Sequence, residues 1–141
     1  MRTRAFAATA LAAAAAAAAL IVLAVSGCTA GPAETVVDAH AGSATVAPGG
    51  ELVVDFGEVN FSVGDSWEIV TAPDPMVLSP GEMESEYIGP KNSVGGPSEM
   101  VYRFEAIAPG TTVIEFEYRF RGGVPEDAAD QDRARIEVVV E

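Results

Sequence analysis

The sequence has very little cysteine and histidine. Its 141 residues include one cysteine, Cys28, and one histidine, His40. A single cysteine cannot form an intrachain disulfide, so packing alone has to hold the fold together. The lone histidine precedes the strand-rich part of the chain and cannot complete a Ser–His–Asp set. We therefore expect no enzyme activity, no metal site and no cofactor.

Basic residues are scarce as well. Eight Lys and Arg residues face 21 Asp and Glu residues, which gives a formal net charge of −13. A surface this acidic repels phosphate backbones and anionic lipid headgroups. The charge balance argues against nucleic acid as a partner and against docking of the folded domain on a membrane surface.

The N-terminus carries the one long apolar run. Arg2 and Arg4 precede this run, which ends in "VSGC", residues 25–28. A positive head, an apolar middle and small residues are typical of a secretory signal. The run is also long enough for an uncleaved membrane helix. We favour cleavage because "VSGC" resembles the lipobox of bacterial lipoproteins, with the only cysteine at the required position.

The lipobox resemblance implies a lipid on Cys28 and a place on the extracytoplasmic face of the bacterial cell membrane. It also predicts the domain boundaries. Residues 1–27 are expected to be the signal peptide, and residues 28–45 the lipidated N-terminus and a flexible tether rich in Ala, Gly, Thr and Pro. Residues 46–141 are then one domain of ordinary size.

Sustained helical periodicity is absent after the signal, and alternation with a period of two replaces it. We expect strands at residues 51–56, 66–70, 100–106, 111–120 and 135–141, with a weaker edge strand at 34–39. Alternating strands with one charged face have to pair their apolar faces. The prediction is an all-β, immunoglobulin-like antiparallel β-sandwich without disulfides.

The segment between the second and third of these strands, residues 72–98, is irregular, with five prolines and four glycines. A connection of this length without periodicity is usually functional or mobile. The acidic run "EDAADQD", residues 126–132, lacks the central glycine and the ligand spacing of a calcium loop. We interpret it as a solvated hairpin.

Several motifs then occur in a recognisable order. "NFSVGDSW" places Asn60, Gly64 and Trp67 after the first strong strand, and "SVGGPSEMVYRF" places Gly95 and Gly96 before the third. "PGTTVIEFEY" and a valine-rich last strand follow. Over residues 46–141 this order resembles the chagasin family of cysteine-peptidase inhibitors, which have an immunoglobulin-like sandwich fold.

The resemblance implies reversible blocking of a papain-like peptidase by three loops at one end of a monomeric sandwich. The loop corresponding to the family's N-P-T-T-G motif would approach the catalytic cysteine, and the other two would flank the cleft. The implied contact residues are Asn60, Phe61, Ser62, Val63, Gly64, Gly95, Gly96, Pro97, Arg119, Phe120 and Arg121.

All departures from the family pattern fall in these loops. Asn-Phe-Ser-Val-Gly replaces Asn-Pro-Thr-Thr-Gly, so Phe61 stands in place of the rigidifying proline, while Ser62 keeps a hydroxyl. Pro97 replaces a threonine, and "FRG" replaces the R-P-W of the third loop. A second hypothesis therefore stays open, in which the same scaffold is a non-inhibitory binding module of the cell envelope.

Two aromatic residues have competing interpretations. Trp67 could be a binding anchor, but it shares strand parity with Ile69 and is expected in the core. Phe61, at a loop tip, is either folded back onto the end of the sandwich or exposed to a partner.

Overall fold

The computed structural model describes residues 31–141, so the predicted signal peptide and Cys28 lie outside the described residues. This part of the chain contains eight strands and one 3-10 turn. The elements are β1 Glu34–Asp38, β2 Ser43–Val46, β3 Glu51–Val59, β4 Asp65–Thr71, β5 Glu82–Tyr87, β6 Ser98–Glu105, β7 Gly110–Phe120, η1 Ala128–Asp130 and β8 Arg133–Val140. Among these residues, no helix is long and apolar enough to cross a membrane.

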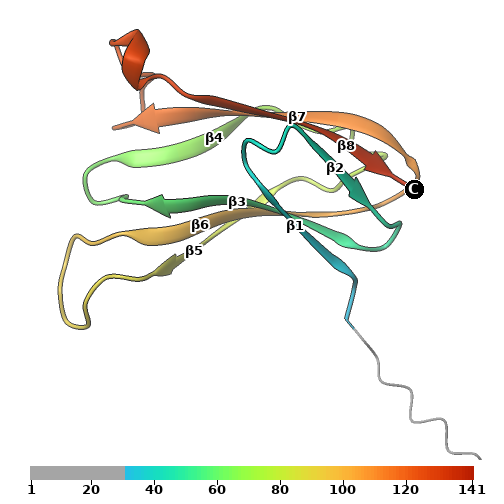
Figure 1. Ribbon diagram of the computed structural model, residues 1–141, viewed down its shortest axis with the longest axis horizontal. Coiled ribbons are helices and arrows are strands. Elements are labelled where there is room, and N and C mark those ends of the chain that lie inside the picture. The colour runs from blue at the N-terminus through green and yellow to red at the C-terminus, as the bar shows by residue number, and fades with distance from the viewer. Residues whose placement is uncertain (1–30) are drawn as a thin grey trace, which may run out of the picture.

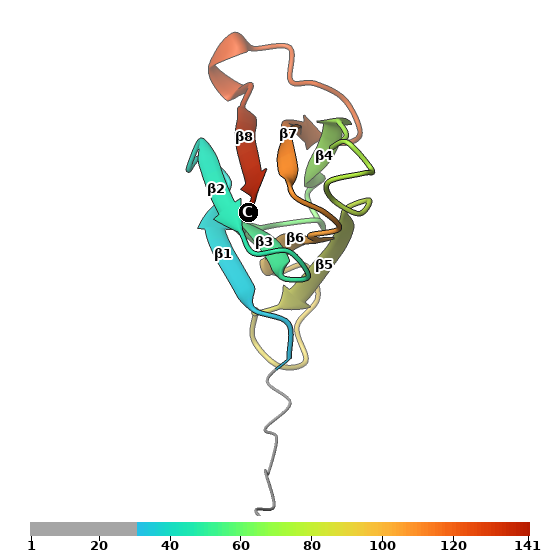
Figure 2. The same ribbon diagram turned by 90° about the vertical axis from the view of Figure 1, so that its right-hand side faces the viewer.

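The strands form two four-stranded sheets that pack face to face (Figures 1 and 2). One sheet has the order β1-β3-β6-β5 and the other β2-β8-β7-β4. The predicted all-β sandwich without disulfides is confirmed. The sheets are mixed rather than purely antiparallel, because β1 pairs with β3 and β2 with β8 in parallel. β1 and β3 belong to one sheet, and β2, which lies between them in the sequence, belongs to the other. The chain reverses its direction after β1 and again after β2, so β1 and β3 run in parallel.

The weak edge strand expected at 34–39 is confirmed as β1, and the predicted tether is wrong from Glu34 onward because β1 and β2 are both part of the sandwich. Ala44 and Val46 of β2 are buried, and so is Ala39 in the turn between the two strands. Ser43–Val46 is only four residues long and buries two small side chains. An alternation this short is too weak to distinguish a strand from an Ala- and Thr-rich linker.

A single cluster of apolar side chains fills the space between the sheets. Its largest fully buried members are Phe104, Phe116, Leu52, Leu78, Met100, Ile114 and Ile136. Trp67 joins the same cluster, which confirms its predicted place in the core. The described core residues lie between Ala39 and Val140. The described strand pairings begin at Glu34, so the domain without its predicted N-terminal signal keeps all of them.

Strand β5 was not expected from the sequence, which predicted an irregular segment there. All six of its residues, Glu82–Tyr87, are exposed. The strand forms one edge of its sheet, paired with β6 alone. Backbone hydrogen bonding to β6 stabilises it, so no buried face appears as alternation in the sequence.

Candidate functional site

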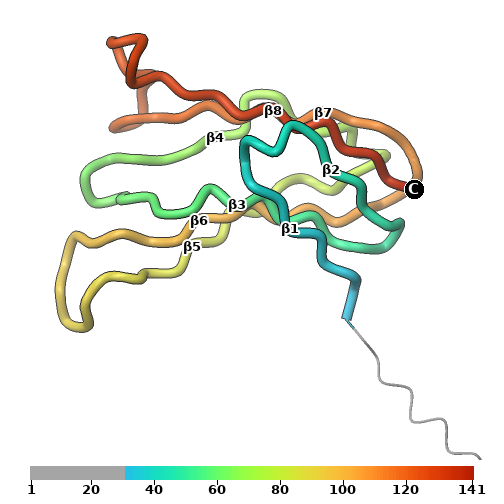
Figure 3. The backbone as a smooth tube through the Cα atoms, in the orientation of Figure 1, coloured from blue at the N-terminus to red at the C-terminus, as the bar shows by residue number. Residues whose placement is uncertain are grey.

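Three loops gather at one end of the sandwich, at the left of the backbone trace in Figure 3. They join β3 to β4, β5 to β6, and β7 to β8. The C-terminus and the start of β1 lie toward the other end (Figure 1). The loops named from the sequence thus come together, although residues 60 and 121 are far apart in the chain.

The β3–β4 loop, residues 60–64, is a compact turn closed by Asn60. The side-chain Oδ1 of Asn60 accepts a hydrogen bond from Ser62 N at 3.1 Å. Its backbone oxygen accepts from Val63 N and Asp65 N, each at 3.2 Å. An asparagine that bonds the backbone two residues on is a common turn former. These bonds fix the tip from within, and its side chains stay directed at solvent.

The first loop contacts the third through Gly64. Arg121 N donates to Gly64 O at 2.7 Å. Gly64 has φ +108°, and a Cβ there would lie 2.6 Å from Arg121 Cγ and 3.0 Å from Arg121 N. Glycine is therefore required at position 64 both by backbone conformation and by space.

The second loop approaches the first from its other side. A Cβ on Gly95 would lie 3.7 Å from Ser62 Cβ and 3.8 Å from Ser62 Oγ, which is ordinary contact distance. Gly96 lies against the Tyr87 ring, and Pro97 O accepts from Ile88 N at the base of the loop. The β3–β4 loop is thus flanked on both sides, in the order β5–β6, β3–β4, β7–β8.

Two of the three residues named in the third loop lie at its exposed root. Phe120 ends β7 with 40% of its side chain exposed, and the Arg121 guanidinium carbon lies 5.0 Å from the centre of its ring. Arg119 differs, because it lies inside β7 and forms ion pairs with Glu117 at 2.8 Å and Glu68 at 3.4 Å. Arg119 is engaged on the sheet and is not free at the loop.

The loop end exposes several apolar side chains. Phe61 is 36% exposed and Val63 47%, while Val94 at the tip of the second loop is 99% exposed. Phe61 lies outside the core cluster, so the structure favours the exposed alternative for this residue. Exposed apolar side chains grouped on neighbouring loops are typical of a surface that a partner protein covers.

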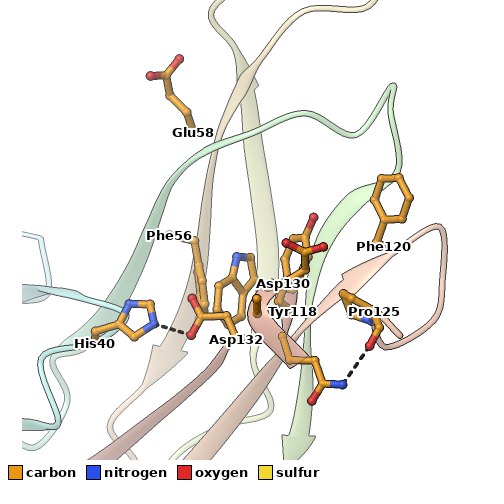
Figure 4. Close-up of a pocket in the computed structure, with 11 residues that line it drawn as sticks. His40, Phe56, Glu58, Tyr118, Phe120, Pro125, Asp130 and Asp132 are labelled. Carbon is orange, nitrogen blue, oxygen red and sulfur yellow. Dashed lines mark hydrogen bonds and ion pairs between the residues drawn. The ribbon is translucent and has the colours of Figure 1, made fainter. Parts of the chain in front are cut away.

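An open cavity of about 730 Å³ lies beside the third loop, and the sequence reasoning did not find it. Figure 4 shows His40, Phe56, Tyr118 and Asp132 around it. The lining residues come from β3, β4, β7, the β1–β2 turn and the β7–β8 loop. No local motif links segments so distant in sequence. His40 is thus part of the folded domain, contrary to its predicted place in the tether.

The acidic segment 126–132 forms the outer edge of this cavity. Asp127 caps the short turn η1 by accepting from Ala129 N at 2.9 Å. Within residues 31–141, no group of three or more His, Cys, Asp or Glu side chains is arranged to hold a metal ion. The segment is a capped hairpin connection, as its spacing indicated.

Tyr118 connects the cavity to Asp65, the first residue of β4, directly after the β3–β4 loop. Its hydroxyl donates to Asp65 Oδ1 at 2.6 Å. This hydrogen bond, together with burial and the charges of Asp65 and Asp130, raises the pKa of Tyr118 to about 12. The phenol therefore stays neutral at physiological pH and stands in a negative electrostatic field.

The motif order, the sandwich and the three adjacent loops agree with a sequence-family match. The family model described as "Chagasin family peptidase inhibitor I42" matches residues 46–138. The chain belongs to the chagasin family. Its members are peptidase inhibitors and not enzymes, which agrees with the expected absence of enzyme activity. No curated protein matches the sequence.

Solved structures of similar fold include "Solution Structure of Amebosin", with a TM-score of 0.58, 18% identity, and coverage of 79% of this chain and 100% of that chain. The cysteine protease inhibitor EhICP2 from Entamoeba histolytica has a TM-score of 0.55 at 18% identity, covering 77% and 96%. PbICP-C, solved in complex with falcipain-2, has a TM-score of 0.50 at 14% identity, covering 79% and 93%. At these identities, the likeness establishes the chagasin-type fold.

Proposed function

We propose that this chagasin-family domain inhibits papain-like cysteine peptidases by placing its three adjacent loops in the active-site cleft. The observation that carries the proposal is the position of the β3–β4 loop between its two neighbours, hydrogen-bonded to the third loop through Gly64–Arg121 and with Ser62 close to Gly95 of the second. EhICP2, which is named as a cysteine protease inhibitor, and PbICP-C, which was solved in complex with falcipain-2, support the choice of peptidase class.

The loop geometry suits an inhibitor that binds reversibly. A tip closed by Asn60 and backed by Gly64 is ordered before binding, so little conformational entropy is lost when the peptidase is bound. The tip is a turn and not an extended strand, so it offers the peptidase no extended peptide to cleave. Ser62 would face the catalytic thiol, with Phe61 and Val63 covering the cleft on either side.

Inhibition is tested by titrating residues 29–141 against papain and a cathepsin-L-type enzyme. We expect nanomolar inhibition that recovers fully on dilution, because no covalent bond is formed. The double variant Phe61→Ala/Ser62→Ala should weaken inhibition at least about tenfold, since residues at interface centres commonly contribute more than about 1 kcal/mol each.

A matched control carries two substitutions at the other end of the sandwich, Met76→Ala and Ile107→Ala, both of exposed apolar residues. This control should inhibit like wild type. If the folded wild-type domain shows no inhibition at tens of micromolar, peptidase inhibition of the papain type is rejected. The envelope-binding alternative would then be tested with the loop end as bait.

We further propose that the protein is a monomeric bacterial lipoprotein, held on the extracytoplasmic face of the cell membrane by a lipid on Cys28. The motif "VSGC" supports this placement. The start of β1 lies away from the loop end (Figure 1). A domain anchored through Cys28 would therefore direct its loops away from the membrane. Metabolic labelling with an alkyne fatty acid tests the proposal: the wild-type protein should incorporate the label and Cys28→Ser should not, whereas equal labelling of the two, or labelling of neither, would contradict a lipid on Cys28.

A further inference from the structure

The cavity beside the third loop combines an aromatic floor with an acidic rim. Phe56, Trp67 and Tyr118 line it, with ring centroids 5.0 Å apart for Phe56–Trp67 and 5.8 Å for Trp67–Tyr118. The ring pairs are tilted by 40° and 65°, so the three aromatic residues do not stack as a flat layer. Rings set at angles around a space can present their faces to a single bound group.

Three acidic residues belong to the lining of the cavity, and the Glu58 carboxylate points away from the rings (Figure 4). Glu58 lines the β3 side, and Asp130 and Asp132 line the side of the β7–β8 loop. Asp132 is held in place by a 3.1 Å hydrogen bond with His40 Nε2 (Figure 4). None of the described residues that line the cavity is a lysine or an arginine, and His40, the basic residue among them, pairs with Asp132, so Glu58 and Asp130 have no basic partner in the lining.

The electrostatics and the aromatic faces select the same kind of ligand. A cation within about 6 Å of an aromatic ring face is attracted by the ring quadrupole, most strongly over tryptophan. Carboxylates at the rim add attraction over a longer range and repel anions. An ammonium or guanidinium group matches both features.

The cavity is continuous with the loop end. Phe120 lines it and also belongs to the third loop, so a protein seated on the loops would cover the cavity mouth. We infer that the cavity binds a lysine or arginine side chain of the peptidase that the loops engage. The choice of occupant rests on the proposed inhibitory function, whereas the cation selectivity rests on the cavity alone.

Trp67 is the only tryptophan in the chain, so its fluorescence reports directly on the cavity. Residues 29–141 are titrated with N-acetyl-arginine amide and with N-acetyl-citrulline amide, a neutral analogue of nearly the same shape. We expect a saturable change in emission in the millimolar range with the arginine probe, weakened by added salt, and no saturable change with citrulline. Equal responses to both probes, or none to either, would overturn the cation site.

A double variant, Glu58→Gln/Asp130→Asn, removes two rim charges and keeps all three rings. It should weaken binding of the arginine probe about tenfold, as expected for two partly screened charge pairs. The control Glu86→Gln/Glu137→Gln removes two exposed charges that do not line the cavity. This control should bind the probe like wild type. A tenfold loss in the control would show that the weaker binding comes from the change in net charge and not from the loss of the rim carboxylates.

Inhibition of papain then tests the occupant. If the peptidase supplies the cation, the Glu58→Gln/Asp130→Asn variant should inhibit about tenfold more weakly than wild type, and the charge control should not. Wild-type inhibition with no loss in the double variant would overturn the peptidase assignment and leave the inhibitory function intact. Absence of inhibition by wild type would instead reject the proposed function and this occupant together, while the arginine titration would still decide the cation site.

Discussion

Two connections in this chain have similar compositions and opposite structural roles. Residues 72–81 join β4 to β5 with three prolines and one glycine, and residues 88–97 join β5 to β6 with two prolines and three glycines. The first is held tightly against the core. The second extends into solvent at the loop end.

The β4–β5 connection is fixed by long-range contacts. Leu78 is fully buried, and Val77 beside it is nearly so. Asp74 N donates to Thr112 Oγ1 at 2.7 Å, and Ser79 N donates to Glu105 O at 2.9 Å. These contacts involve β6 and β7, so the connection is part of the sandwich itself.

The β5–β6 loop satisfies its hydrogen bonds mostly within itself. Ile88 N donates to Pro97 O, and Ser93 Oγ donates to Pro90 O at 2.8 Å. Val94 at its tip makes almost no contact with the rest of the domain. The comparison shows that proline and glycine content does not separate a structural connection from an exposed loop. The adjacent apolar pair Val77–Leu78 distinguishes the structural connection from the exposed loop.

Leu78→Ala should have the largest effect on stability. Truncating a fully buried leucine removes apolar contacts and leaves a cavity, which costs about 2–5 kcal/mol. Urea unfolding followed by Trp67 fluorescence measures the loss. A loss below about 1 kcal/mol would show that residues 72–81 are no better anchored than the exposed loop.

Gly64→Ala should have the second-largest effect on stability, and its structural effect should be concentrated at the loop end. Alanine at φ +108° is strained, and its Cβ would collide with Arg121, so we expect a loss of about 1–3 kcal/mol and much weaker inhibition. Gly122→Ala is the control, because Gly122 also has positive φ, +81°, but has no atom within 4 Å of the added Cβ. Equal inhibition by the two variants would contradict a role for the Gly64–Arg121 contact.

Thr112→Val should cost about 1 kcal/mol by leaving Asp74 N without its acceptor at nearly unchanged side-chain volume. Thr111→Val is a matched control on the same strand, since Thr111 is exposed and Thr112 is buried. Thermal unfolding of the two variants compares them directly. Equal stability of the two would mean that water replaces the threonine hydroxyl and that this bond does not fix the connection.

The sheets could be predicted from sequence where one face is buried and the other charged. Strands β4, β6, β7 and β8 show this alternation, whereas β3 buries Leu52, Val53 and Val54 in succession and was recognised by its apolar run. The motif order then indicated the family. Strands β1 and β2 were missed or weak because they are short edges of small side chains, and β5 because nothing in it is buried. These three edge strands depend mainly on backbone pairing, which carries little sequence signal, whereas the edge strand β4 was recognised because it buries Trp67.

The candidate loops were predicted from their motifs, and the cavity was not. Asn60 and Gly64 carry a local turn pattern that spacing alone reveals. The cavity instead requires His40 to meet Asp132, which are 92 positions apart. Only the path of β1 and β2 along the sandwich brings them together, and that path was the part of the fold assigned to a tether.

Val94→Ser should have the smallest effect on stability, within about 0.5 kcal/mol, because this side chain has no contacts to lose in the free domain. Inhibition should still weaken up to about tenfold, since a valine buried by a partner contributes roughly 1.5 kcal/mol. Met76→Ser is the counterpart in the β4–β5 connection, where Met76 is 73% exposed. It should change neither stability nor inhibition.

If both variants inhibit like wild type, Val94 lies outside the contact surface, and binding would have to rest on the other two loops. If both weaken inhibition equally, the effect is not specific to the loop end, and the distinction between a structural connection and a binding loop would fail for function while still holding for stability.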